Sequence, residues 1–158
     1  MQVVKVEEVH FRRINAGTVL DICDLSDTLS DEQREMVADN AVSIAQAHFS
    51  ENAWFRGIYA DDTPIGFIML HYGSDYDDEI DVDGAFLWRF MIAGPYQGKG
   101  YGKQAMKRLM NQLKGQGIHE LITSCGEGAG SPLGFYKGLG FTPNGETFGD
   151  EIGLAIKF

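Results

Sequence analysis

The sequence predicts a single α/β domain in which a mixed sheet of about seven strands is flanked by about four helices. With 158 residues, 44% of them hydrophobic, the chain is long enough for one core and too short for two, so residues 1–158 are taken as one domain. The segment order, β-α-α-β-β-β-α-β-α-β-β, lacks the strict βαβ repeat of a parallel sheet. Residues 85–114 join an apolar strand, a glycine-rich turn and an amphipathic helix.

The first part of the chain is predicted to contain a strand over residues 9–14, a short helix over 16–25 and a second, longer helix. Ser30 is the predicted N-cap of the longer helix, because Gln33 three residues later completes a capping box. The residues at helical spacing after it are Val37, Ala41, Ile44, Ala45 and His48. Because His48 falls on this face, we expect it to be packed in the core rather than catalytic.

A hairpin and a buried strand follow. Residues 54–60 and 65–72 are strand-like runs separated by the turn sequence Asp61-Asp62-Thr63-Pro64. Residues 85–92, AFLWRFMI, are almost uniformly apolar, as expected for a central strand covered on both faces. Arg89 interrupts this run, and we interpret it as a structural ion-pair partner, with a role in the site as the alternative.

The second half of the chain alternates helices and strands. The helix that runs to Lys114 has one apolar and one basic face. Residues 118–125 are the next predicted strand, and a late helix lies within about 131–140, where Gly140 stops it. Residues 141–158 complete the sheet as a strand pair.

The turn Gln97-Gly98-Lys99-Gly100-Tyr101-Gly102 carries the strongest functional signal. A glycine-rich turn between a strand and a helix leaves backbone N–H groups unpaired, and the helix dipole adds positive potential to them. Glycines also let a ligand approach the backbone closely. The pattern therefore predicts a site for a phosphate or pyrophosphate group.

Three kinds of phosphate-binding loop compete for this turn. A P-loop does not fit, because Lys99 is not followed by the Ser or Thr that binds magnesium. A dinucleotide-binding loop fits poorly, because Lys103 stands where its third glycine is required. The third pattern, Gln/Arg-x-x-Gly-x-Gly/Ala, is matched in full by Gln97, Gly100 and Gly102.

By this third pattern the chain resembles the GCN5-related N-acetyltransferases, and the element order is similar over nearly the whole chain. The resemblance implies acetyl-CoA as cosubstrate, with its pyrophosphate on the glycine loop and its pantetheine arm along the 85–92 strand, like an added strand. It also implies that the Ile92 N–H polarises the thioester carbonyl. The cofactor-binding residues that it implies are Phe90, Met91, Ile92, Gln97, Gly98, Lys99, Gly100, Tyr101, Gly102, Lys103 and Ser131.

A second match lies in residues 131–141, whose Phe-Tyr-x-x-Leu-Gly-Phe pattern resembles the late helix of the same family. The resemblance implies that Tyr136 is the catalytic acid, whose hydroxyl protonates the CoA thiolate as it leaves. Many members carry an Asn seven residues earlier, where this chain has Ala129, so Ser131 or a backbone group is expected to take that role. The acidic residues are too numerous for the sequence to single out a general base.

Composition narrows the class of partner. The formal net charge of −10 disfavours nucleic acid, which needs a basic surface, and permits a cationic substrate. No run approaches the ~18 apolar residues of a membrane span, and the N-terminus does not look like a signal peptide. Cys23 and Cys125 are far apart and, like the histidines, lack metal-ligand spacing, so we expect reduced cysteines, no metal and a cytoplasmic protein.

The predicted acceptor is a small cationic amine. Residues 74–84 hold six acids and no base, which indicates either a solvated loop or an electrostatic funnel for a polycation. Residues 40–55, 59–67 and 87–92 are similar to the Bacillus-type spermine/spermidine (diamine) N-acetyltransferases. This similarity implies direct acetyl transfer to a polyamine or diamine.

Two alternatives stay open. One is an acetyltransferase for another small amine or a protein N-terminus, and the other is a non-catalytic acyl-CoA-binding regulatory domain. For assembly, the resemblance suggests a homodimer through edge strands or the last strand pair.

Overall fold

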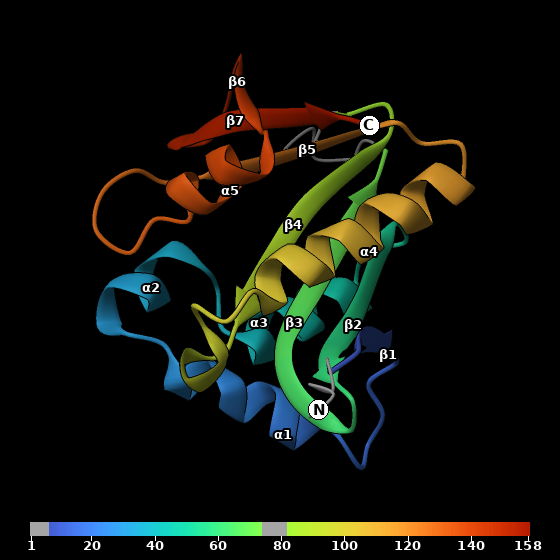
Figure 1. The fold of residues 1–158 in the computed structure, drawn as a ribbon, viewed down its shortest axis with the longest axis vertical. Coiled ribbons are helices and arrows are strands. Elements are labelled where there is room, and N and C mark those ends of the chain that lie inside the picture. The colour runs from blue at the N-terminus through green and yellow to red at the C-terminus, as the bar shows by residue number, and fades with distance from the viewer. Residues whose placement is uncertain (1–6, 74–81) are drawn as a thin grey trace, which may run out of the picture.

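The computed structural model describes residues 7–73 and 82–158, so most of the acidic segment predicted at 74–84 lies outside the described residues. The described chain forms one mixed sheet, covered by helices on both faces (Figure 1). Its strands are β1 (Val9–Arg12), β2 (Ala53–Ala60), β3 (Thr63–Tyr72), β4 (Ala85–Ile92), β5 (Glu120–Cys125), β6 (Thr142–Phe148) and β7 (Glu151–Lys157). The strand order is β1-β2-β3-β4-β5-β7-β6, in which β4 and β5 pair in parallel and the other neighbours pair antiparallel. The predicted fold class is confirmed.

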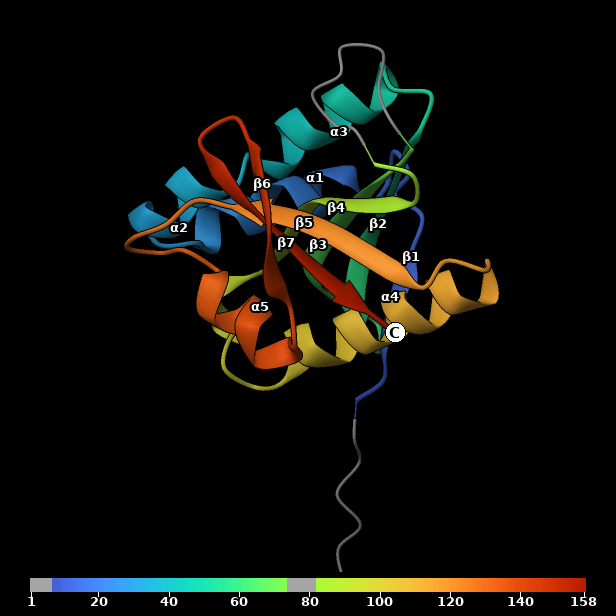
Figure 2. The same ribbon diagram turned by 90° about the horizontal axis from the view of Figure 1, so that it is seen from above.

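Helices lie on both faces of this sheet. They are α1 (Val19–Asp24), α2 (Asp31–Met36), α3 (Asn40–His48), α4 (Tyr101–Gly115) and α5 (Leu133–Leu139), with 3₁₀ turns η1 (Leu25–Thr28) and η2 (Gly94–Tyr96). Figure 2 shows α1 and α3 on one face and α4 and α5 on the other. Within residues 7–73 and 82–158 the α-helices therefore number five rather than about four.

The additional helix arises because the long helix predicted from Ser30 to His48 is wrong as a single element. The capping box at Ser30 is confirmed, but α2 ends at Val37, whose backbone is extended with φ −140° and ψ 137°. A β-branched residue is a weaker helix former than the residues around it. The chain turns helical again after Asp39, whose carbonyl accepts the Ser43 N–H at 3.0 Å. The break lets α2 take a direction of its own, beside the site described below (Figure 1).

The inner face of α3 also differs from the prediction. Its buried residues are Asn40, Ser43 and Ala47, whereas His48 is exposed. Polar residues occupy the inner face because Asn40 finds hydrogen-bond partners there, as described below.

Strand β4 separates two cores. Phe90 and Ile92 pack into the larger core under α4 and α5, together with Tyr136. Met91 packs into the smaller core on the other face, with Ile22 of α1. Within the part of the chain that the structure describes, no helix is both long and apolar enough to cross a membrane.

Candidate active site

The candidate site lies where β4 and β5 separate. In the described residues their parallel pairing ends at Leu87 and Thr123, and the Thr123 hydroxyl donates to the Leu87 carbonyl at 2.9 Å. The next residue of β4, Trp88, is left out of the pairing with β3 as a bulge. A bulge bends its strand and increases the local twist. The second half of β4 therefore diverges from β5 and leaves a V-shaped opening in the sheet.

The second half of β4 directs backbone groups into this opening. The Ala93 N–H donates to the Ile65 carbonyl of β3 at 2.8 Å. Because antiparallel pairing alternates, the polar groups of Phe90 and Ile92 then point away from β3. In agreement, the Ile92 carbonyl accepts a hydrogen bond from Gln97 Nε2 at 2.9 Å. This edge can pair with an extended ligand as it would with a strand.

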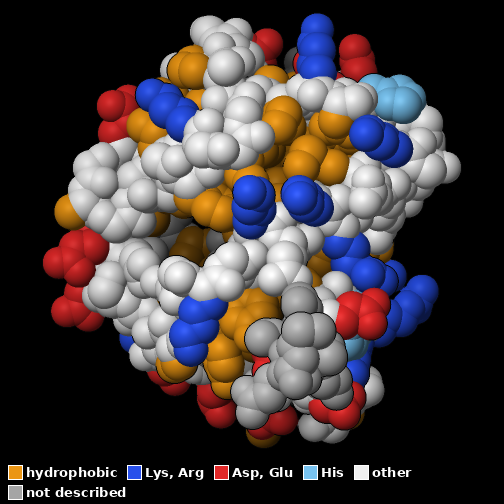
Figure 3. All heavy atoms as spheres, in the orientation of Figure 1, with side chains coloured by type: hydrophobic (Ala, Val, Ile, Leu, Met, Phe, Trp, Pro, Cys, Tyr) orange, Lys and Arg blue, Asp and Glu red, His pale blue; other side chains and the backbone are white. Residues whose placement is uncertain are grey.

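A cavity of about 750 Å³ occupies the opening, within the size range of small-molecule sites. Figure 3 shows the surface hollowed beside β4, where α2, α5 and the start of α4 meet. The predicted cofactor residues that line it are Phe90, Met91, Ile92, Gln97, Gly98, Gly100, Gly102, Lys103 and Ser131. Lys99 lies exposed in the loop, and Tyr101 donates a hydrogen bond from its hydroxyl to Glu7.

The glycines of the loop serve different purposes. Gly98 and Gly100 have φ values of +73° and +85°, and a Cβ at either position would meet no atom within 4 Å. They are required for the left-handed backbone and leave open space above the loop. In contrast, a Cβ on Gly102 would lie 3.1 Å from the Phe135 ring, so this glycine permits close packing of α4 on α5. The open loop and the unpaired N–H groups of a 15-residue helix fit a pyrophosphate group.

Gln97 anchors the loop, and α2 is its partner. Besides its bond to Ile92, the Gln97 amide exchanges two hydrogen bonds with the Gln33 amide, at 3.0 and 3.3 Å. On the other side of the cavity, α2 packs so closely on Gly130 that a Cβ there would lie 2.5 Å from the Glu32 carbonyl carbon. Helix α2 therefore contacts both the glycine loop and the loop that enters α5. The sequence indicated Gln33 as a helix cap, and no signal in it indicated this second contact.

Tyr136 lines the cavity from α5. Its side chain is only 4% exposed, and its ring lies against Phe135 and Phe141, at centroid distances of 5.5 and 5.3 Å. Burial raises the pKa of Tyr136 well above that of an ordinary tyrosine, and a side-chain hydrogen bond with Thr123 opposes this only in part. The phenol is therefore protonated at neutral pH, as a proton donor must be.

Cys125 is the cysteine of this cavity. Burial raises its pKa, and a hydrogen bond with the Ser131 side chain partly opposes that effect. Because the thiolate rather than the thiol is nucleophilic, Cys125 is poorly suited to attack a thioester. The Ser131 hydroxyl also donates to the Gly126 carbonyl and accepts from the Leu133 N–H at 3.2 Å, so it organises the loop that enters α5.

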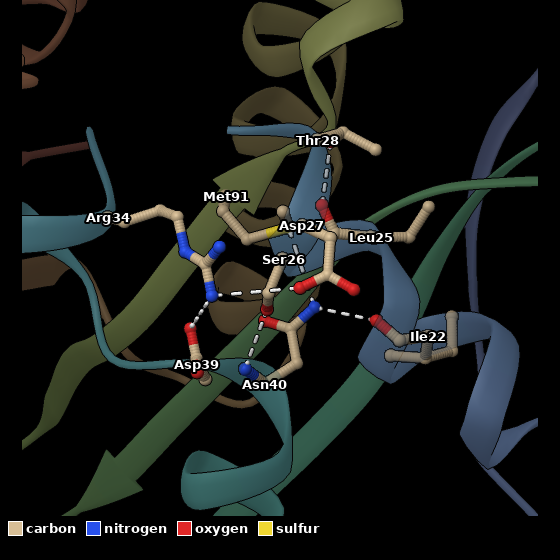
Figure 4. Close-up of polar contacts among 9 residues, drawn as sticks. All are labelled: Ile22, Leu25, Ser26, Asp27, Thr28, Arg34, Asp39, Asn40 and Met91. Atoms are coloured by element: carbon tan, nitrogen blue, oxygen red, sulfur yellow. Dashed lines mark hydrogen bonds and ion pairs between the residues drawn. The ribbon is translucent and has the colours of Figure 1, made fainter. Parts of the chain in front are cut away.

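On the opposite side of β4, a buried asparagine ties the N-terminal helices together (Figure 4). Asn40 is 1% exposed, and its backbone N–H donates to Ser26 Oγ at 2.9 Å. Its Nδ2 donates to the Ile22 carbonyl at 2.8 Å and lies 3.7 Å from Met91 Sδ. Asn40 thus connects α1, η1 and α3 to the strand that forms the cavity wall. No local pattern in the sequence indicates this role, because the partners of Asn40 lie far away in the chain.

Two arginines line the same side of the cavity, and both have partners there. Arg34 lies 3.6 Å from each of Asp27 and Asp39 (Figure 4). Arg89 donates to the Gln46 side chain of α3 at 3.0 Å. Both guanidinium groups thus connect the elements of the N-terminal half. Among the described residues, no three His, Cys, Asp or Glu side chains are grouped as metal ligands.

The chain matches a known protein family. The family described as "Acetyltransferase (GNAT) family" matches residues 20–141. The chain belongs to the GNAT acetyltransferase family. It is an N-acetyltransferase that uses acetyl-CoA, which confirms the family, the activity and the cosubstrate expected from the sequence.

Individual relatives agree with this assignment. Spermine/spermidine N(1)-acetyltransferase of Bacillus subtilis (strain 168) is 27% identical over 132 residues, covering 75% of this chain and 87% of the relative. The PaiA N-acetyltransferase of Thermoplasma acidophilum, crystallised with coenzyme A, is 20% identical with a TM-score of 0.65, covering 96% of this chain and 99% of the other. An acetyltransferase of Thermus thermophilus is 17% identical with a TM-score of 0.71, covering 97% of this chain and 99% of the other. Both of these solved structures have the same fold as this chain.

Proposed function

We propose that this GNAT enzyme acetylates a primary amine of a polyamine or diamine such as spermine or spermidine. The observation that carries this proposal is the similarity to the Bacillus subtilis spermine/spermidine enzyme over 75% of the chain. A net charge of −10 supports it, because an acidic protein attracts polycations at long range.

The cosubstrate would be held mainly by backbone groups. Acetyl-CoA supplies an acetyl group activated as a thioester. Gly98, Gly100 and the N-terminus of α4 would bind its pyrophosphate, while Phe90 and Ile92 would pair with the pantetheine arm. Met91, Tyr101 and Lys99 would have lesser roles, since the Met91 backbone points toward β3 and the other two do not line the cavity described here. Lys103 would add positive charge near the phosphates.

The transfer is proposed to be direct, without an acyl-enzyme. The amine nitrogen attacks the thioester carbon, and the Tyr136 hydroxyl gives its proton to the departing sulfur. Tyr136 carries its proton at neutral pH, as this role requires. The raised pKa of Cys125 disfavours the competing route through an acetylated cysteine.

The acceptor can be tested by CoA release with a panel of amines at several salt concentrations. Putrescine and butylamine form the matched pair, because they share a four-carbon chain and differ in the second ammonium group. We expect kcat/KM to be higher for spermine, spermidine and putrescine than for butylamine, and this advantage to shrink as salt rises. Equal kcat/KM for putrescine and butylamine would contradict the polyamine proposal. Turnover only with other amines or with a peptide N-terminus would reassign the acceptor and leave acetyl transfer in place.

A further inference from the structure

Acetyl transfer to an alkyl amine needs a proton acceptor as well as a proton donor. Such an amine has a pKa near 10, so it arrives at neutral pH as an ammonium ion that cannot attack. Within the described residues, two carboxylates line the cavity: Glu35 on α2 and Glu151 at the start of β7. Glu35 is exposed, whereas Glu151 is half-buried.

Successive side chains of β5 point to opposite faces of the sheet, so they reach the cavity from opposite sides. Thr123 and Cys125 are buried on the side of α4 and α5, where Cys125 and Tyr136 share the larger core. Ser124 lies between them, so its side chain points to the opposite face of the sheet. There the Ser124 hydroxyl donates to Glu151 Oε1 at 3.0 Å.

Other contacts agree that this is the opposite face. Ile122, two residues before Ser124, packs there against Val82 and Phe86, as Phe148 also does. Glu151 and Tyr136 nevertheless line the same cavity. A proton donor and a carboxylate therefore meet in one cavity from opposite faces of a split sheet.

We propose that Glu151 accepts the proton of the amine substrate, and that Ser124 holds its carboxylate in position. The proposal rests on acetyl transfer and not on which amine is used. Glu151 takes one proton from the ammonium ion, and the freed nitrogen lone pair forms the C–N bond. The C–S bond breaks with its electron pair on sulfur, which takes a proton from Tyr136. The nitrogen then loses its second proton, which restores Tyr136 through solvent, and Glu151 releases its proton to solvent.

Besides Glu151, the charged and titratable residues that line the same cavity are Arg34, Glu35, Arg89, Tyr96, Lys103, Cys125 and Tyr136. Glu35→Gln is therefore the matched control, since it removes the other carboxylate of the cavity without touching Ser124 or Glu151.

The test compares two acceptors that differ in basicity. One is any alkyl amine that the wild type acetylates, and the other is a fluorinated alkyl amine that is unprotonated at neutral pH. We expect Glu151→Gln to lower kcat/KM about 10²–10⁴-fold with the alkyl amine and far less with the fluorinated amine. The alkyl-amine loss should shrink as the pH approaches the pKa of the amine, while the affinity for CoA stays unchanged. Glu35→Gln should keep the wild-type pH profile.

Equal losses with both amines would overturn the proposal, because a merely structural role would not depend on the basicity of the acceptor. Ser124→Ala provides a second variant, in which a smaller loss with the same dependence on the amine is expected. If spermidine proves not to be an acceptor, the polyamine proposal fails, while this test proceeds with whichever alkyl amine reacts.

Discussion

The wall of the cavity formed by the free edge of β4 and the glycine loop presents backbone groups, whereas the wall toward α3 and β7 is held in place by pairs of side chains. On the first wall, Phe90 and Ile92 offer main-chain groups at a free strand edge, and Gly98 and Gly100 keep an open left-handed loop. Such a site depends on backbone conformation and on the absence of side chains. It suits acetyl-CoA, the cosubstrate of this enzyme.

The second wall depends on pairs of side chains from distant elements. Asn40 ties α3 to Ile22 and Met91, and Ser124 holds Glu151. A change in one side chain there alters the shape or charge of the wall without touching the cofactor loop. A substitution on one wall should therefore leave the other wall in place.

The largest expected effect is at Tyr136, which joins the chemistry of the two walls. Tyr136→Phe should lower kcat about 10²–10⁴-fold, because it removes the proposed proton donor. The affinity for CoA should change little, because the ring stays packed between Phe135 and Phe141. CoA release and calorimetric titration with CoA measure the two quantities.

Tyr72→Phe is the control for this substitution. The Tyr72 hydroxyl donates to Gln116 at 3.1 Å and does not line the cavity, so kcat should be unchanged. An undiminished kcat in Tyr136→Phe would remove this tyrosine as the acid.

The next effect tests the backbone wall alone. Gly100→Val forces a β-branched residue into a left-handed conformation, which costs about 1–2 kcal/mol, and places methyl groups where the ligand would lie. We expect CoA to bind at least about tenfold more weakly, since about 1.4 kcal/mol is a factor of ten. Gly115→Ala, at the far end of α4, is the control, because its Cβ would meet no atom within 4 Å. Wild-type affinity in Gly100→Val would mean that the loop does not hold the pyrophosphate.

The two walls also differ in how far the sequence predicts them. The proposed cofactor loop is six consecutive residues, 97–102, and Tyr136 lies in a similarly short motif, so a family resemblance along the chain was enough to suggest both. In contrast, 27 positions separate Ser124 from Glu151, and 51 separate Asn40 from Met91. Only the folded sheet brings these pairs together. A pattern read along the chain had no means of choosing Glu151 among the acids.

The break between α2 and α3 was missed for a related reason. Apolar spacing runs on through Val37, and it reports which side of a helix is apolar without reporting where the helix stops. The capping box at Ser30 was predicted correctly, because both of its members lie within one turn. The Asp39-Asn40 pair, whose residue types are typical of a helix N-terminus, was the signal that could have indicated a new helix.

A substitution on the side-chain wall should impair stability and the KM for the amine but spare CoA affinity, the reverse of what is expected for Gly100→Val. Asn40→Ala leaves the Ile22 carbonyl without its buried side-chain donor, so we expect a loss of about 1–3 kcal/mol in the free energy of unfolding. The KM for the amine should rise while the affinity for CoA is kept. Urea denaturation and steady-state kinetics measure these effects. Asn111→Ala, exposed on α4, should leave stability nearly unchanged, and a weakened CoA affinity in Asn40→Ala would contradict the separation of the walls.

The smallest expected effect is at the amide pair Gln33–Gln97, the contact through which α2 reaches the cofactor loop. Substitutions at this pair test whether the two walls act independently. Gln33→Leu, Gln97→Leu and the double variant form a cycle in which the affinity for CoA and the KM for the amine are both measured. Gln97→Leu should weaken CoA more than Gln33→Leu, since it also frees the Ile92 carbonyl. The coupling energy should be about 0.5–1.5 kcal/mol in CoA affinity, the usual net worth of a hydrogen bond. Coupling that appears equally in the KM of the amine would mean that α2 transmits cofactor binding to the acceptor wall, and the two walls would then be one cooperative unit.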